Sequence, residues 1–265
     1  MTINVYPNMT NFVTTSSNES ASALPATYQV ARGLVTGVTS FAINGYQSAL
    51  PITNYYPIWE NASYYPTYPS SAAVQYLTSS SASDTAVQVL VSGVSSTYAP
   101  ISETVTLNGT AYVSTVNSYL RINSLNVTST TSPIGSVTIG PSNSSITTVY
   151  ATIGLTTQNG SSVSNGRSNM SVYTVPTGFT LYITRQQVFV AAGGSNYGTY
   201  RIYSANSGVL NISNSSPIQY PGYSVTQVTP LVYTAGTDVQ FQVSVTGSVP
   251  VGIQIEGLLI SGAAN

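Results

Sequence analysis

The chain contains no cysteine, no histidine and no lysine, and only 4% of its 265 residues are charged. In an average globular protein about a quarter of the residues are charged. Without cysteine there is no disulfide framework, no thiol nucleophile and no thiolate metal site. Without histidine no Ser–His–Asp triad can form, and no Gly-x-Ser-x-Gly motif occurs.

The six acidic and five basic residues give a net charge of −1. Nucleic acids and anionic membranes bind clustered Lys and Arg, so we expect no direct contact with nucleic acid. The acidic residues are scattered, and we expect no enzyme activity, no cofactor and no metal. A calcium site made of backbone carbonyls is the alternative that the sequence leaves open. Because acid unfolding comes mainly from paired carboxylates, so few of them predict tolerance of low pH.

Segments with an apolar residue at every second position dominate the rest of the sequence. In residues 238–247, Val239, Phe241, Val243 and Val245 alternate with polar residues, which is typical of a half-buried strand. Asn108–Gly109, between two such segments, predicts a tight β-hairpin. Helix-forming residues in helical spacing are missing. The sequence therefore predicts an all-β fold, a β-sandwich that is jelly-roll-like.

Composition divides the chain into three parts. Residues 1–30 are polar and predict an extended N-terminal arm. Residues 31–83 include a stretch rich in Pro and Tyr, which we expect to pack on the domain or between subunits. Residues 84–265 carry the recurring strands and predict the sandwich, with two smaller sandwiches divided near residue 170 as the alternative.

An aromatic segment surrounds the only tryptophan, Trp59. Tyr and Trp supply rigid amphipathic area for contacts. We consider three roles: a cover over its own domain, which we favour, a subunit contact, and a glycan-binding platform. The residues concerned are Tyr55, Tyr56, Trp59, Tyr64, Tyr65 and Tyr68.

Asn-x-Ser/Thr occurs ten times. Such motifs mark asparagines that a glycosylation machinery modifies on exposed loops. We set aside Asn108, which is needed in a tight turn, and Asn214, which is followed by Pro217. The candidates are Asn8, Asn18, Asn61, Asn126, Asn143, Asn159, Asn169 and Asn211.

Six motifs follow one another in a familiar order, at residues 31–35, 58–60, 79–86, 101–110, 117–123 and 173–178. They resemble a family of virion structural proteins of tailed, largely marine, phages, over about residues 31–185. That resemblance implies a component of a virus particle and transfers no catalytic residue. The family's charged residues are replaced here by Ser, Thr, Asn and Tyr. In this respect the chain is similar to surface and virion proteins of hyperthermoacidophilic archaea and their viruses.

The N-terminus has neither a basic region nor an apolar run, so we expect no secretory signal, and no stretch of apolar residues is long enough for a transmembrane segment. We expect a homo-oligomer on the exterior of a virus particle, as a shell, decoration or turret protein that contacts other virion proteins. Host-surface glycans are a further candidate partner. The alternatives are a receptor-binding tail or spike, and an archaeal cell-surface filament glycoprotein joined by donor-strand exchange.

Overall fold

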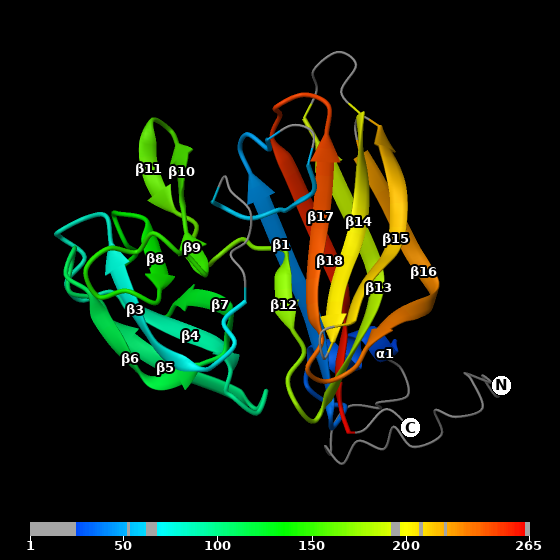
Figure 1. Cartoon of the computed structure of the whole chain (residues 1–265), viewed down its shortest axis with the longest axis horizontal. Coiled ribbons are helices and arrows are strands. Elements are labelled where there is room, and N and C mark those ends of the chain that lie inside the picture. Colours follow the sequence, from blue (N-terminus) through cyan, green and yellow to red (C-terminus); the bar gives the residue numbers. More distant parts are fainter. Residues whose placement is uncertain are drawn as a thin grey trace.

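The computed structural model of the chain describes residues 25–51, 54–61, 68–191, 197–206, 209–219 and 222–262. These residues form 18 β-strands and one helix of six residues. The strands pair antiparallel and build two sandwiches, a large one and a small one, which lie side by side (Figure 1). The prediction of an all-β sandwich is therefore confirmed.

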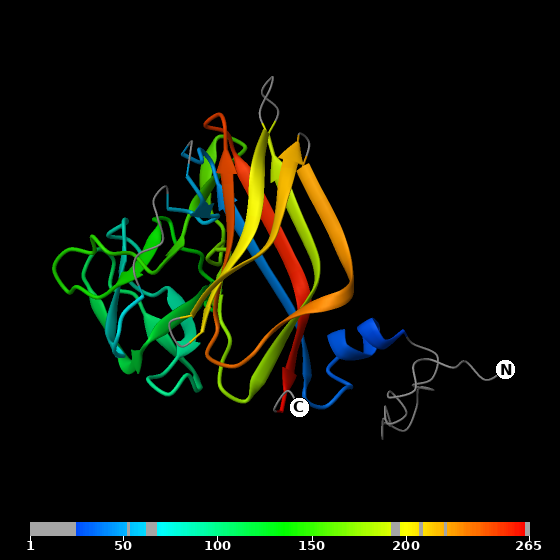
Figure 2. The same ribbon diagram turned by 45° about the vertical axis from the view of Figure 1, so that its right-hand side comes forward.

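Most of the predicted N-terminal arm, up to residue 24, lies outside the described residues. From there the chain is not extended, because α1 (Ala26–Ala31) follows Pro25. Proline is favoured where a helix starts, and the helix ends where Gly33 adopts a φ of 70°, which glycine tolerates. The helix lies beside the lower end of the large sandwich (Figure 2).

The large sandwich consists of two sheets. The first has the strand order β1 (Val38–Gln47), β18 (Val251–Ser261), β13 (Phe179–Val190) and β16 (Gly222–Tyr233). The second has the order β12 (Val172–Thr174), β17 (Asp238–Val245), β14 (Tyr197–Asn206) and β15 (Val209–Gln219). β2 (Tyr56–Pro57) pairs with β17 beyond the end of β12, so these two short strands share one edge.

Strand pairing in the large sandwich is nested. The first strand, β1, pairs with the last, β18, and the β2–β12 edge pairs with β17. β13 then pairs with β16, and β14 with β15. The chain therefore runs out through four strand positions and back through four, with each returning strand beside its counterpart.

Both sheets of the large sandwich share one hydrophobic core. It includes Val239, Phe241 and Val243 of β17 together with Leu181 and Ile183 of β13, all fully buried. β17 forms as predicted, but its polar face is buried too: Gln240 and Gln242 are 8% and 7% exposed, and the Gln240 side chain donates to the Tyr68 hydroxyl at 3.4 Å. A strand predicted to be half-buried is thus covered on both faces.

The small sandwich is inserted between β2 and β12. One sheet has the order β6 (Val113–Tyr119), β3 (Ala73–Ser79), β8 (Val137–Gly140) and β9 (Ala151–Ile153). The other has the order β5 (Pro100–Thr106), β4 (Gln88–Val94) and β7 (Arg121–Val127), and a separate hairpin joins β10 (Leu155–Gln158) to β11 (Ser161–Ser164). Its own core contains Leu77, Val91 and Ile139.

The fold does not divide at residue 84. Within 31–83, β1 and β2 belong to the large sandwich, whereas β3 belongs to the small one. The predicted hairpin at Asn108–Gly109 is also wrong, since β5 and β6 on its two sides lie in different sheets. Gly109 does turn with a φ of 60°, but its amide donates to the Asp84 carbonyl at 2.9 Å. The turn therefore carries the chain from one sheet to the other.

Candidate functional site

The described aromatic residues of 55–68 pack onto the protein itself. Trp59 is 1% exposed in the core of the small sandwich, and Tyr56 is buried in the core of the large one. Neither side chain is available for a partner in this structure, so their assignment to a subunit or glycan contact is corrected. Tyr64 and Tyr65 lie outside the described residues.

Tyr55 and Tyr68 are half-buried and each carries an arginine on its ring. The Arg201 guanidinium lies 3.7 Å from the centre of the Tyr55 ring, and that of Arg121 lies 4.3 Å from the centre of the Tyr68 ring. Cation–π contacts of this kind are worth about 0.5–2 kcal/mol, depending on exposure. They hold the two ends of the aromatic segment against β14 and β7.

A nearly buried ion pair joins the two sandwiches. Arg121 of β7 donates from Nε and Nη2 to the two carboxylate oxygens of Asp238 on β17, both at 3.0 Å. The two side chains are 9% and 8% exposed. The Thr174 hydroxyl donates to the same carboxylate at 2.6 Å. Bidentate geometry and burial make this a strong polar contact between the sandwiches.

Asn123 reinforces that junction. Its side-chain amide donates to the Thr174 carbonyl and accepts from the Thr174 amide, both at 2.9 Å. This pair of bonds copies the exchange between two residues of a β-ladder. β7 of the small sandwich is thereby joined to β12 of the large one.

Glu60, which follows Trp59 in the aromatic segment, contacts the base of the β10–β11 hairpin. Its carboxylate accepts hydrogen bonds from the Gly154 amide at 2.7 Å, from the Asn169 side chain at 2.8 Å and from the Asn165 side chain. Burial raises the pKa of Glu60 above 4.5, because desolvation of the charge outweighs these hydrogen bonds. Asn169 is engaged in this contact rather than free for modification.

The remaining candidate glycosylation sites fall into three groups. Asn8 and Asn18 lie outside the described residues. Asn61 and Asn126 are half-buried. The sites with exposed side chains are Asn143, Asn159 and Asn211, and Asn159 forms the β10–β11 turn with a φ of 50°.

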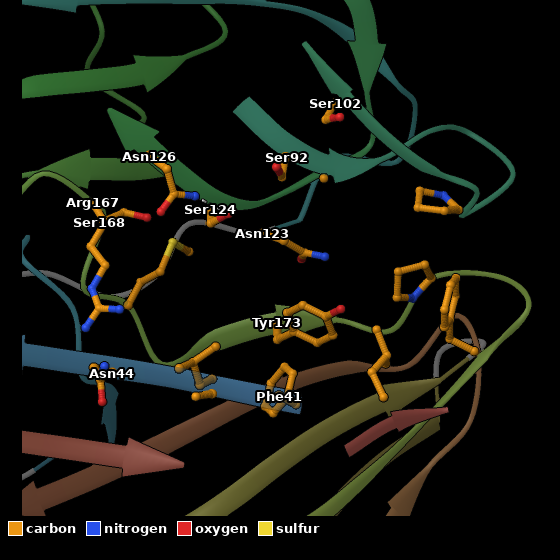
Figure 3. Close-up of a pocket in the computed structure, with 18 of the residues that line it drawn as sticks. Phe41, Asn44, Ser92, Ser102, Asn123, Ser124, Asn126, Arg167, Ser168 and Tyr173 are labelled. Carbon is orange, nitrogen blue, oxygen red and sulfur yellow. Dashed lines mark hydrogen bonds between the residues drawn. The ribbon is translucent and has the colours of Figure 1, made fainter. Parts of the chain in front are cut away.

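A cleft of about 510 Å³ opens between the two sandwiches. One wall is the outer face of β4, β5 and β7 with Arg167, which bridges to Asn126 of β7, and the other is the edge strand β1 with Tyr173 of β12 (Figure 3). Sites for small molecules have volumes of about 300–1,000 Å³ and occur preferentially at such domain junctions. This cleft is the candidate functional site.

Hydroxyl and amide groups line the cleft together with apolar side chains, and the polar groups include a row on one wall. Ser92 of β4 is the register partner of both Ser102 on β5 and Ser124 on β7, so three serines form a row across one wall. Asn126 follows on β7, where its amide donates to Ser124 Oγ at 3.2 Å. Asn44 faces them from β1 (Figure 3).

Aromatic rings and one cation complete the cleft. Tyr173 and Phe41 meet edge to face with ring centres 4.8 Å apart. Burial raises the pKa of Tyr173 to about 12, so its hydroxyl stays protonated and able to donate. The exposed Arg167 side chain extends from the opposite wall toward Asn44 (Figure 3). Sequence reasoning missed these residues, because Ser and Asn occur throughout the chain.

Within the described ranges no group of three or more acidic side chains could hold a metal ion. The same residues contain no helix long and apolar enough to cross a membrane. No model of a known protein family matches the chain, and no curated protein matches it. The fold, the composition and the cleft are therefore the features that indicate a function.

Proposed function

We propose that the protein is a structural protein on the exterior of a virus particle. The observation that carries the proposal is the nested pairing of the large sandwich, with the first strand on the last and the two middle strands together. Two sheets with eight strand positions nested in this way are the pattern of a jelly roll, an architecture of viral capsid domains and of lectins, and in this proposal the large sandwich is one.

Composition supports the same function. Only 4% of the residues in the chain are charged, so its polar surface comes from Ser, Thr, Asn, Gln and Tyr. Such a composition suits a particle exposed to low pH. The resemblance to phage virion proteins covers about residues 31–185, from the end of α1 into β13, and so includes the whole small sandwich. In this proposal the chain has a structural rather than a catalytic role.

Self-assembly would use the side of the large sandwich opposite the small one. β15 and β16 are the edge strands there (Figure 2). Edge strands offer unpaired backbone groups to other chains, and exposed apolar side chains favour burial in a contact. Several apolar side chains on these two strands are at least half exposed: Val209, Ile212, Val228 and Val232.

The filament alternative is less well supported. In donor-strand exchange a strand from the next subunit fills a vacant position in a sheet. Here β1 already pairs with β18 along ten residues, and each sheet of the large sandwich has four strand positions filled by its own chain. A receptor-binding appendage remains the second candidate, because the cleft between the sandwiches has the size and polarity of a ligand site.

The self-assembly part of the proposal is tested by sedimentation and electron microscopy of the full chain. We expect closed oligomers whose formation depends on protein concentration. The double variant Ile212→Glu and Val228→Glu should shift the chain to monomers. Ile134→Glu is the matched control, because Ile134 is 62% exposed on the small sandwich. A wild-type chain that stays monomeric at every concentration would contradict the proposal.

A further inference from the structure

We propose that the cleft between the two sandwiches binds an acidic saccharide, a sugar chain that carries a carboxylate. This function goes beyond the structural role above and does not depend on it, since the cleft is complete within one chain. The inference stands on three features of the cleft: a row of hydroxyl groups, an aromatic floor and an arginine without an acidic partner.

The hydroxyl row suits a ligand with many hydroxyl groups of its own. Residues paired across adjacent strands point to the same face, and the strands lie about 4.8 Å apart. Ser102, Ser92 and Ser124 therefore offer three neighbouring hydroxyls along one wall. Each hydroxyl both donates and accepts, so it can pair with a sugar hydroxyl in either direction.

The Tyr173 ring supplies the apolar surface that a sugar ring also needs, and the buried Phe41 ring packs against it edge to face. Tyr173 is half-buried and lines the cleft beside Phe41 (Figure 3). The C–H face of a pyranose is apolar, and an aromatic side chain with a polar tip can contact that face while donating to a hydroxyl. Burial raises the pKa of Tyr173 to about 12, so its hydroxyl is protonated at neutral pH.

Arg167 selects an acidic sugar over a neutral one. Its guanidinium is exposed at the cleft and forms no hydrogen bond or ion pair with any other side chain in the described part of the chain. Asp238 pairs with Arg121 and Glu256 with Arg185, whereas Glu60 accepts bonds from Asn165, Asn169 and Gly154. Guanidinium binds a carboxylate with two parallel hydrogen bonds, which makes a uronic acid the matching ligand.

The test is a titration of the full chain with six oligosaccharides. Oligomers of galacturonate, glucuronate and mannuronate are compared with the neutral oligomers of galactose, glucose and mannose. We expect at least one uronate to bind, and to bind more tightly than its neutral counterpart. No binding of any uronate would overturn the proposal, and so would equal affinity for a uronate and its neutral counterpart.

Two variants test whether the ligand binds in the cleft. Arg167→Gln should weaken uronate binding by roughly tenfold or more and leave neutral sugars unaffected, since a charged hydrogen bond is lost. Ser102→Gln fills the cleft from an exposed position and should weaken both classes. Arg185→Gln is the control, because that arginine is 42% exposed and pairs with Glu256 away from the cleft. Unchanged uronate affinity in Arg167→Gln would overturn the assignment.

Asn126 gives an independent test, because it lines the cleft and begins a glycosylation motif. A glycan attached there would occupy the space that the proposal gives to the ligand. Peptide mapping of the native protein should find Asn126 unmodified. A sugar on Asn126 would overturn the proposal.

Discussion

Replacing Asp238 by Asn removes the negative partner of a nearly buried guanidinium without changing the size of the side chain. Arg121 is then left with its charge, 9% exposed, at the junction of the two sandwiches. It keeps two hydrogen bonds, from Nη1 to the carbonyls of Pro69 and Leu120, both at 2.9 Å. The variant therefore measures what the carboxylate contributes.

Removing one partner of a buried ion pair costs about 3–5 kcal/mol, because the other charge stays buried without compensation. The two remaining carbonyl contacts and the Tyr68 ring solvate part of the Arg121 charge, so we expect a loss near the lower limit, about 3 kcal/mol. Glu256→Gln is the matched control. Its pair with Arg185 is 3.5 Å long and about 40% exposed, which predicts about 0–1 kcal/mol.

Urea unfolding with two probes provides the assay. Fluorescence of Trp59 reports on the small sandwich, whose core contains this tryptophan, and far-ultraviolet circular dichroism reports on all strands. In Asp238→Asn the fluorescence transition should occur at lower urea than in the wild type and should separate from the dichroism transition. Equal losses in Asp238→Asn and Glu256→Gln would refute the view that this pair joins the sandwiches.

Three further predictions concern single side chains. Burial raises the pKa of Glu60, so the charged carboxylate destabilises the fold at pH values above that pKa. The free energy of unfolding of the wild type, relative to Glu60→Gln, should therefore rise as the pH falls from the raised pKa to 4.5 and stay constant below 4.5. Urea titrations of both proteins at pH 7 and pH 4 check this. Trp59→Ala should cost about 3–5 kcal/mol in a melting experiment, because the indole is 1% exposed, whereas Tyr55→Ala should cost less. Peptide mapping of protein from a glycosylating host should find a sugar on the exposed Asn143 but not on Asn169, whose amide bonds to Glu60; an unmodified Asn143 beside a modified Asn169 would contradict this.

Local patterns predicted the local structure well. The alternation of Val239, Phe241 and Val243 predicted β17, since a period of two marks the side chains that enter a core. Asn159–Gly160 forms a tight turn with φ values of 50° and 80°, as Asn-Gly pairs favour. Asn108–Gly109 turns as well, but the identity of the strands that pair around it is a property of the whole sheet.

Most of the features that the sequence did not predict depend on pairing between strands that are far apart along the chain. β1 and β18 are paired although more than 200 residues separate them, and no local signal connects the two segments. Trp59 enters the core of the small sandwich and bridges to Met170, more than 100 residues away, whereas the sequence predicted only that its segment covers its own domain. The cleft is built from the junction of both sandwiches, so its residues become recognisable as a set only once the strands are placed.

We propose that the chain belongs to the outside of a virus particle. Gold-labelled antibodies against the exposed β10–β11 hairpin, applied to intact particles and to host cells, can be located in the electron microscope. We expect the label on the outer surface of the particles. Label on cell-surface filaments or envelopes, with unlabelled particles, would contradict it.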